Sequence, residues 1–262
     1  MTEREKELDR IAKLLVRRDL ALTEANERLI AMDKAKSEFV SIAAHQLRTP
    51  LTAVKWTLNM IMAGDMGKIS KEQQEFLQKG YKTNERMIRL VNDLLNVARI
   101  EEGRFGYKFE KIDLIELIEE IVQWNQKNFK AKNLQLEFIK PKYSLSKIRT
   151  DPERLRLAIQ NILDNAYHYT ITGGVAVILE RKNNQVQISI KDTGIGIPQE
   201  QMSRLFEKFF RGSNIMRKGM GPEGTGLGLY IAKNIIEAHD GEIGFESTEN
   251  QGSVFWFTLP LI

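Results

Sequence analysis

The chain has 262 residues, 42% of them hydrophobic and 28% charged, a balance that is ordinary for a soluble protein with a packed core. Its 39 basic and 35 acidic residues give a net charge of +4 and are interleaved along the whole chain, so the basic excess argues only weakly for nucleic acid, and no nucleic acid partner is expected. No cysteine is present, so disulfides, thiolate metal sites and cysteine nucleophiles are excluded.

No segment reads as a membrane span or a signal peptide. The longest stretch without Asp, Glu, Lys or Arg is residues 165–179, which is too short to cross a bilayer and contains Asn165, His168 and two glycines. The first residues lack the apolar core of a signal peptide. We therefore expect a cytoplasmic chain with no membrane contact of its own, either complete or cut from a longer protein that is membrane-anchored or soluble.

Residues 1–38 are predicted to form a coiled-coil helix, because apolar residues recur there with heptad spacing. One seam position holds Leu8, Leu15, Leu22 and Leu29, and the other holds Ile11, Ala25, Met32 and Phe39. Arg18 and Lys36 interrupt the seam, so the zipper should be marginal, as in a rod that shifts register or rotates. The alternative is an ordinary surface helix of a bundle.

Residues 39–102 are predicted to form an antiparallel helical hairpin. The apolar spacing continues to Ile61, breaks at residues 64–67 and resumes from Phe76 to Ala98. One hairpin has too little core to stand alone, whereas two copies make a four-helix bundle. We therefore expect a homodimer.

Residues 103–262 are predicted to form an α/β two-layer sandwich, with a mixed or antiparallel sheet covered by helices on one face. The helical period ends near Glu101–Gly106, which marks the domain boundary. Strands are expected at residues 107–111, 134–139, 175–181, 186–192, 243–247 and 254–259. Helices are expected at residues 113–129, 152–169, 199–205 and 227–238.

Two glycine-rich segments indicate a nucleotide. Residues 192–198 (DTGIGIP) end a strand with a carboxylate, which suits an exocyclic amine such as that of adenine, and the glycines let the backbone approach a flat ligand. Residues 224–229 (GTGLGL) open a helix, where free N–H groups and the helix dipole favour phosphate. Either segment alone is more often simple turn chemistry, and no βαβ unit supports a dinucleotide site.

Asn161 and Asn165 stand four residues apart on the helix expected at 152–169, so both carboxamides share one face. Their neutral oxygens suit a hydrated Mg²⁺ ion, although a pair of solvent-facing polar residues is the alternative. His168 lies close by, but it has no partner at metal-ligand spacing and is not predicted to bind a metal.

His45 lies on the first helix of the hairpin. At about 100° per residue it faces away from Leu47 and Val54, so its imidazole should be exposed. An incidental surface histidine is the competing interpretation. Pro50 removes one backbone hydrogen bond and should bend the helix near His45, and such a bend favours a special site there.

Taken in order, these motifs resemble the conserved boxes of bacterial two-component sensor histidine kinases. The H box corresponds to Phe39 with residues 45–51 (HQLRTPL), the N box to 161–166 (NILDNA), the G1 box to 192–198, the F box to 206–211 (FEKFFR) and the G2 box to 224–229. The resemblance implies a HisKA-type dimerisation and phosphoacceptor domain followed by an ATP-binding domain of the GHKL (Bergerat) type.

The resemblance also implies roles for residues of the nucleotide site. Asn165 corresponds to the Mg²⁺ ligand, Asp192 to the reader of the adenine amine, and Tyr169 packs on the adenine. His168 stands where the family often has lysine. The remaining nucleotide-binding positions are Asn161, Gly194, Gly196, Gly224, Thr225, Gly226, Leu227 and Gly228.

The catalytic positions follow in the same way. His45 corresponds to the phosphoacceptor, and Thr49 matches the position that orients water when the family dephosphorylates its partner. Arg211, with Arg217 and Lys218, is suited to neutralise phosphate charge, and residues 212–223 would form a lid over ATP. Position 46 is usually acidic in this family, whereas this chain has Gln46.

The family implies a kinase that phosphorylates His45 from ATP·Mg²⁺ and passes the phosphoryl group to an aspartate of a response regulator receiver domain. Two other classes stay open. The nucleotide fold is shared with ATPases that transfer nothing to histidine, and Gln46 leaves room for a dimeric scaffold that binds ATP without phosphorylating.

Overall fold

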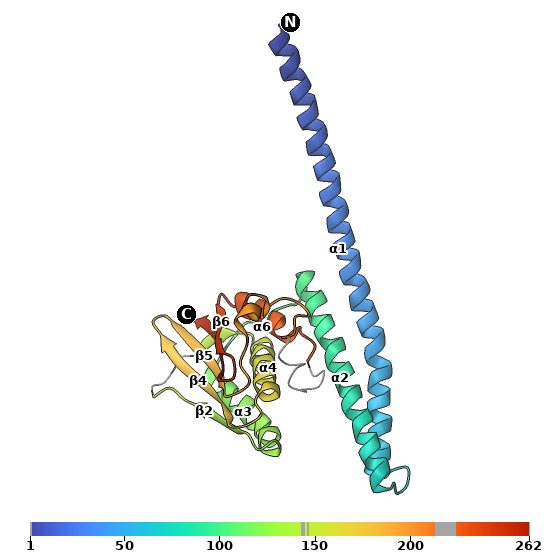
Figure 1. The fold of residues 1–262 in the computed structure, drawn as a ribbon, viewed down its shortest axis with the longest axis vertical. Coiled ribbons are helices and arrows are strands. Elements are labelled where there is room, and N and C mark those ends of the chain that lie inside the picture. The colour runs from blue at the N-terminus through green and yellow to red at the C-terminus, as the bar shows by residue number, and fades with distance from the viewer. Residues whose placement is uncertain (1, 143–144, 146, 213–223, 262) are drawn as a thin grey trace.

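The structure, a computed structural model, describes residues 2–142, 145, 147–212 and 224–261. It begins with two helices, α1 (Glu3–Ala63) and α2 (Lys71–Glu101), which pack against each other as the predicted antiparallel hairpin. Figure 1 shows α1 extending far beyond the end of α2 towards the N-terminus. Among the described residues, no helix is both long enough and apolar enough to span a membrane.

Local sequence explains where the hairpin turns. Gly64 and Gly67 take positive φ angles of 88° and 108°, which glycine adopts without the strain that other residues meet. Ser70 and Gln73 then form a reciprocal capping box that starts α2. Pro50 lies inside α1, and the helix continues on both sides of it.

A small apolar seam holds α1 against α2. Ala44 is buried against Val91 and Leu95, and Leu51 packs on the same cluster. Arg48 adds a polar clamp by donating to the side-chain oxygen of Asn92 at 3.0 and 2.7 Å. Because His45 directly follows the buried Ala44, this seam fixes the position of His45 along the hairpin.

Much of the apolar surface of the hairpin stays uncovered in a single chain. The exposed large side chains include Leu15, Leu22, Leu29, Met32, Phe39, Leu47, Val54, Phe76, Met87 and Leu90. These comprise much of the predicted heptad seam and of the hairpin's apolar face. A run of exposed apolar side chains this long is typical of a surface that another chain covers.

The C-terminal domain, which comprises the residues after α2, is the predicted two-layer sandwich. Its five-stranded sheet has the order β2-β4-β5-β7-β6, in which only β2 and β4 are parallel. The strands are β2 (Gln135–Ile139), β4 (Gly174–Lys182), β5 (Gln185–Asp192), β6 (Ile243–Thr248) and β7 (Gly252–Pro260).

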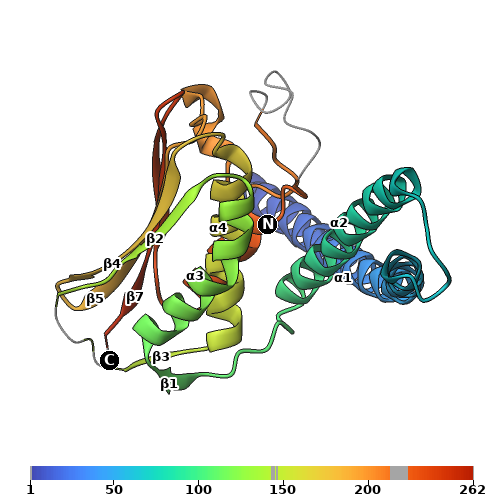
Figure 2. The same cartoon turned by 90° about the horizontal axis from the view of Figure 1, so that it is seen from below.

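Helices cover one face of this sheet, as Figure 2 shows for α3 and α4. They are α3 (Leu114–Ala131), α4 (Pro152–Tyr169) and α6 (Gly228–Glu237), while residues Gln199–Arg204 form a short 3₁₀ helix. Fully buried side chains from both layers, such as Ile159 of α4 and Ile188 of β5, make one core. The predicted fold class is confirmed.

The link between the domains differs from the sequence expectation. The predicted strand 107–111 is shortened to β1 (Glu110–Ile112), which pairs with an unpredicted strand, β3 (Ile148–Thr150). The rings of Tyr107 and Phe109 instead pack on His239, with centroids 5.6 and 4.9 Å away. Aromatic packing therefore replaces strand pairing at residues 107–109.

His239 fixes this corner of the domain. Its ring is 4% exposed, its Nε2 accepts from the Asp151 backbone N–H at 2.9 Å, and its Nδ1 lies 2.7 Å from the Ile235 carbonyl. These bonds require a neutral ring with the proton on Nδ1. Burial lowers the pKa of His239, and the Ile235 bond and nearby acidic groups only partly oppose this.

We therefore predict that the protein loses stability on mild acidification. The unfolded histidine takes up a proton near pH 6.5, whereas the folded ring resists protonation. The free energy of unfolding should fall as the pH drops below about 6.5 towards the lower pKa of the folded state. Chemical denaturation from pH 7.5 to 5 should show a flatter dependence in His239→Gln, and exposed His45→Gln serves as the matched control. An equal slope in His239→Gln and the unmodified protein would contradict this.

Candidate active site

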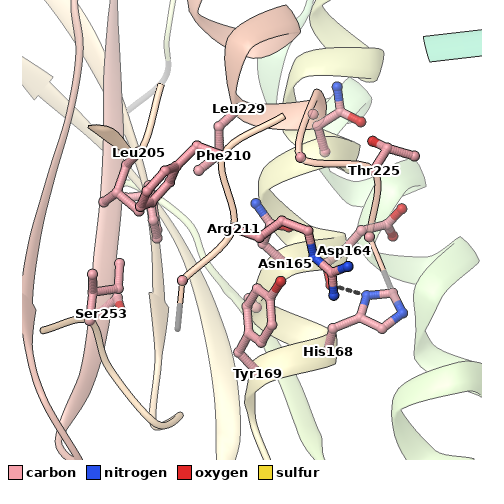
Figure 3. Close-up of a pocket in the computed structure, with 18 of the residues that line it drawn as sticks. Asp164, Asn165, His168, Tyr169, Leu205, Phe210, Arg211, Thr225, Leu229 and Ser253 are labelled. Atoms are coloured by element: carbon pink, nitrogen blue, oxygen red, sulfur yellow. Dashed lines mark hydrogen bonds between the residues drawn. The ribbon is translucent and has the colours of Figure 1, made fainter. Parts of the chain in front are cut away.

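A pocket in the C-terminal domain brings together most of the predicted nucleotide-binding residues. Its lining includes Asn161, Asn165, His168, Tyr169, Asp192, Gly196, Arg211, Gly224, Thr225, Gly226 and Gly228. Figure 3 shows Asn165, His168 and Tyr169 projecting from α4 towards Arg211 and Thr225. Of the predicted set, Gly194 and Leu227 do not line the pocket but adjoin it in the chain.

Helix α4 carries the polar face of the pocket. Asp151 caps its N-terminus by accepting from the Arg154 backbone N–H at 2.9 Å, and Pro152 occupies the first turn, where its missing N–H costs nothing. The opposite face is buried in the core. Asn161 and Asn165 therefore share the face turned to the pocket, as their spacing predicts.

The side-chain amide of Asn161 is a hydrogen-bond donor for which the described residues provide no acceptor. Its side-chain nitrogen is buried and has no hydrogen-bond partner among the described residues. A buried donor left unpaired is costly, typically about 1–3 kcal/mol. A ligand or water in the pocket would remove this cost.

Asp192 ends β5 and is 6% exposed. One oxygen, Oδ1, accepts from the backbone N–H groups of Gly194 at 2.8 Å and Ser253 at 3.3 Å. The other, Oδ2, has no hydrogen bond within the described part of the chain, and the residue lines the pocket. Burial raises the pKa of Asp192, and the two backbone bonds oppose the rise. The site offers one oriented acceptor for a donor group.

One glycine in each of the two loops at the pocket, 192–198 and 224–229, is needed because the backbone packs closely there. Gly196 has φ 61°, and a Cβ there would collide with the Thr248 carbonyl. Gly226, with φ 72°, lies so close to the Phe209 backbone that a Cβ would stand 2.8 Å from it. These positions admit only glycine without a backbone shift, so both loops are held tightly against the pocket.

One end of the pocket is formed by the N-terminus of α6. Gly228 begins the helix, and the Leu227 backbone N–H donates to the Thr225 hydroxyl at 3.2 Å. The remaining first-turn N–H groups and the helix dipole favour an anion here. Gly228 lies beside Asn161, since a Cβ on it would stand 3.4 Å from the Asn161 carboxamide carbon.

His168 and Arg211 border the same end. The Nδ1 of His168 lies 2.6 Å from the Asp164 carbonyl, so Nδ1–H donates to that oxygen. Arg211 is exposed and lines the pocket. Of the predicted lid, only Gly212 is described, and Arg217 and Lys218 lie outside the described residues.

Sequence reasoning missed the contribution of α2. Arg89 and Asp93, one turn apart on α2, line the pocket. The Thr225 hydroxyl donates to Asp93 Oδ2 at 2.7 Å. Burial raises the pKa of Asp93, the Thr225 bond and the Arg89 charge lower it, and the Asp164 charge raises it further. In sequence, these two residues look like an ordinary solvated charge pair.

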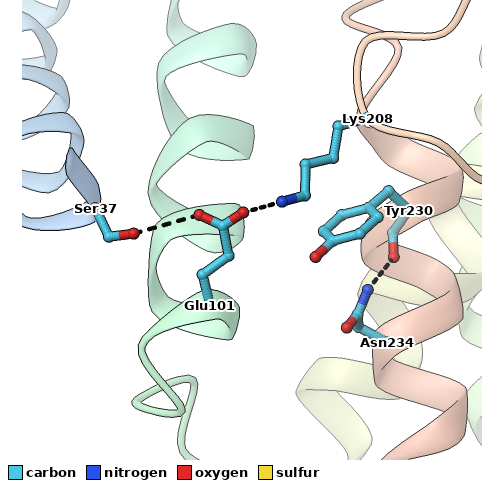
Figure 4. A network of polar contacts seen from close by, with 5 residues as sticks. All are labelled: Ser37, Glu101, Lys208, Tyr230 and Asn234. Carbon is cyan, nitrogen blue, oxygen red and sulfur yellow. Dashed lines mark hydrogen bonds and ion pairs between the residues drawn. The ribbon is translucent and has the colours of Figure 1, made fainter. Parts of the chain in front are cut away.

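A second contact joins α2 to the C-terminal domain. Figure 4 shows Glu101 at the end of α2 between Ser37 of α1 and Lys208 of the predicted F box. Glu101 forms an ion pair with Lys208 and accepts from the Ser37 hydroxyl at 3.3 Å. Burial alone would lower the pKa of Lys208, but the bond and charge of Glu101, together with Tyr230, raise it overall. The lysine is thus held in its charged form.

The predicted phosphotransfer residues form a separate group. His45, Gln46 and Thr49 are all exposed on α1 and do not line the pocket. The buried neighbour of His45, Ala44, packs on Val91 of α2. The predicted acceptor is therefore on the hairpin against which the pocket is docked, but outside the pocket itself.

Comparison with known proteins agrees with this two-part arrangement. Residues 35–103 match the family model of the His Kinase A (phospho-acceptor) domain. Residues 150–262 match the model of the histidine kinase-, DNA gyrase B- and HSP90-like ATPase. The chain belongs to the histidine kinase family. The hairpin is thus its phosphoacceptor domain and the C-terminal domain its ATPase domain.

Individual relatives match nearly the whole histidine kinase chain but are longer. The sensor histidine kinase WalK of Bacillus subtilis is 33% identical over 234 residues, covering 87% of this chain and 37% of WalK. The adaptive-response sensory kinase SasA of Gloeothece citriformis is 35% identical over 246 residues, which is 92% of this chain and 61% of SasA. The chain spans less than two thirds of these relatives.

A solved structure supports the same fold. ShkA, determined full-length in complex with AMPPNP, superposes with a TM-score of 0.69 at 27% identity, covering 85% of this chain and 45% of ShkA. The catalytic domain of histidine kinase ThkA gives a TM-score of 0.51 at 30% identity, over 59% of this chain and 96% of that domain.

We predict that Asp192→Asn weakens nucleotide binding by about ten- to 150-fold. An amide cannot match the carboxylate as an acceptor, and a hydrogen bond to a charged group is worth roughly 1.5–3 kcal/mol. Calorimetric titration with ATP would measure the change. Asp240→Asn, at an exposed position outside the pocket, is the matched control and should bind normally. Binding by Asp192→Asn as tight as that of the unmodified protein would show that Asp192 does not read the base.

Proposed function

We propose that the chain is an ATP-dependent protein-histidine kinase. It binds ATP with Mg²⁺ in the pocket, phosphorylates His45, and passes the phosphoryl group to an aspartate of a response regulator receiver domain. The observation that carries the proposal is the alignment, along one pocket, of the open Asp192 oxygen, the unpaired Asn161 amide and the N-terminus of α6. The Asp192 oxygen would accept from an adenine amine, and the Asn161 amide would donate to a polar group of the ligand. The N-terminus of α6 would bind a phosphate chain.

The residues present fit ATP and a magnesium ion. No cluster of three or more His, Cys, Asp or Glu side chains able to hold a metal exists in the described part of the chain. The ion would therefore be held by the Asn165 side-chain oxygen with phosphate and water oxygens, the pattern that Mg²⁺ favours. The bound ion would supply charge neutralisation to the phosphate chain.

The protein's own groups then position the reaction. Asp192 fixes the base, Tyr169 lies beside it, and the loop 224–228 holds the phosphates. One ring nitrogen of His45 attacks the γ-phosphorus, the bond to the β-phosphate oxygen breaks, and ADP leaves. The other ring nitrogen keeps its proton. The transition state of phosphoryl transfer requires mainly alignment of the reacting groups and neutralisation of the phosphate charge.

Transfer requires a change from the described arrangement, because His45 does not line the pocket. Either the ATPase domain moves on its own hairpin or the pocket receives the histidine of a second copy. The uncovered apolar face of the hairpin supports a homodimer, so both routes are physically open. We assign residues 1–38 to a coiled-coil signalling helix, 39–102 to the phosphotransfer domain and 103–262 to the ATPase domain.

Thr49 supports a second, opposite activity. It is exposed on α1, one turn beyond His45, where a bound receiver domain would meet both residues. There its hydroxyl would orient water for removal of phosphate from the regulator. Gln46 is the feature that favours the alternative function, an ATP-binding scaffold or ATPase without histidine transfer, since it is not the usual acidic neighbour.

We predict that the protein labels itself from γ-labelled ATP at His45 alone. The other two histidines are excluded, because His239 is buried and His168 is bonded to its own helix. The label should be acid-labile and alkali-stable, and His45→Ala should abolish it while still binding ATP. Undiminished labelling of His45→Ala would sink the assignment, and an unlabelled protein that hydrolyses ATP would favour the ATPase.

We further predict that Gln46→Glu speeds self-phosphorylation by about tenfold, below the roughly 10²-fold lower end of general-base effects, because a loose transition state asks little of the nucleophile. A carboxylate offsets the positive charge that develops on the ring, whereas the Gln46 amide only accepts a hydrogen bond. The affinity for ATP should not change, since Gln46 lies outside the pocket. Rapid-quench labelling measures the rate, and an unchanged or slower rate would show that no base is needed at position 46.

A further inference from the structure

The pocket, when only the described residues of the ATPase domain are counted, carries charges that are poorly matched to a polyphosphate. Its lining carries the carboxylates of Asp164 and Asp192, and α2 adds that of Asp93. Among the described lining residues, the guanidinium groups are those of Arg211 and Arg89. One of these two strong cations therefore comes from the dimerisation hairpin and not from the ATPase domain.

We propose that Arg89 of α2 is a phosphate-contacting residue of the nucleotide site and distinguishes ATP from ADP through the terminal phosphate. This inference rests on the ATP binding proposed above and adds a ligand that the ATPase domain does not contain. The site is then complete only when the ATPase domain is docked on α2.

The position of Arg89 follows from the contact made by Asp93. The Asp93 carboxylate accepts from the Thr225 hydroxyl, and Thr225 in turn accepts from the Leu227 N–H at the start of α6. Asp93 is thus bonded to the phosphate-binding loop. Arg89 stands four residues before Asp93, on the same face of α2, and its charge acts on the Asp93 carboxylate.

The pocket has a base end and a phosphate end, and Arg89 lies at the second. Figure 3 shows Ser253, whose N–H donates to Asp192, on the opposite side of the pocket from Thr225. Arg89 belongs with Thr225 because α2 meets the pocket through Asp93. A phosphate chain that starts beyond the base and follows the loop 224–228 therefore ends next to α2.

Arginine at this place has the chemistry that a terminal phosphate requires. Its planar fork of donors binds two phosphate oxygens at once, which lysine cannot reproduce. Asp93 acts as a positioning residue, since its bond to Thr225 holds α2 at the pocket. The competing explanation is that Arg89 only balances the charge of Asp93 and stabilises docking, without touching nucleotide.

Titration of the full chain with AMPPNP and with ADP, both with Mg²⁺, separates these explanations. In Arg89→Gln the Kd for AMPPNP should rise by about tenfold, the low end for a hydrogen bond to a charged group, while the Kd for ADP changes little. Arg89→Lys should fall between the two. Arg99→Gln, an exposed arginine of α2 that does not line the pocket, is the matched control and should change neither value.

Binding of ADP also reports that each variant is folded. Equal weakening of AMPPNP and ADP in Arg89→Gln would overturn the proposal in favour of a docking role. No change for either nucleotide would overturn it as well. If the unmodified protein bound neither nucleotide, the proposed kinase function would fail first, and the role of Arg89 would fail with it.

Discussion

The contact between α2 and the ATPase domain is the constraint on which the rest of the molecule depends. The pocket and His45 lie on different domains, so any chemistry between them is decided by how those domains meet. Among the described residues, the Lys208–Glu101 ion pair, the Thr225–Asp93 hydrogen bond and the packing of Val97 of α2 into the core of the ATPase domain fix the meeting. Both polar contacts link α2 directly to segments of the ATPase domain, the predicted F box (206–211) and the loop 224–228.

One of these contacts also involves the long helix α1. Ser37 of α1 and Lys208 of the ATPase domain share the carboxylate of Glu101. Because Ser37 is 4% exposed and packed at the start of the hairpin, a rotation of α1 relative to α2 would alter the partners of Glu101. The marginal zipper predicted upstream, interrupted by Arg18 and Lys36, would suit such a movement. Glu101, which forms the ion pair with Lys208 of the ATPase domain, therefore also contacts α1 through Ser37.

Local patterns predicted the parts of the fold that local physics determines. Helix α4 begins at Pro152 and ends at Tyr169 as expected, because capping by Asp151 and a regular apolar stripe specify both its ends and its inner face. The same regularity placed Asn161 and Asn165 side by side. Strand β3 was missed because its three residues have no pattern of their own and depend on pairing with β1.

The α2 side of the pocket could not be predicted for a different reason. Asp93 and Thr225 are 132 positions apart, and Glu101 and Lys208 are 107 apart. Such pairs form only when two separately folded domains dock, and neither domain's periodicity encodes that step. Arg89 therefore looked like a solvated residue of a surface helix. The roles given to His45, Gln46 and Thr49 rest on the family motif, since the structure leaves all three outside the pocket.

Distance measurement between spin labels on the two domains tests the docking claim most directly. The chain has no cysteine, so labels on Lys79→Cys of α2 and Glu180→Cys of β4, both exposed, would be unique. Labelled protein diluted with unlabelled chain isolates the distance within one protomer. A narrow distribution should broaden in Glu101→Lys and narrow again when Lys208→Glu restores the opposite charges. The same distribution in all three proteins would contradict the claim that this ion pair docks the ATPase domain on α2.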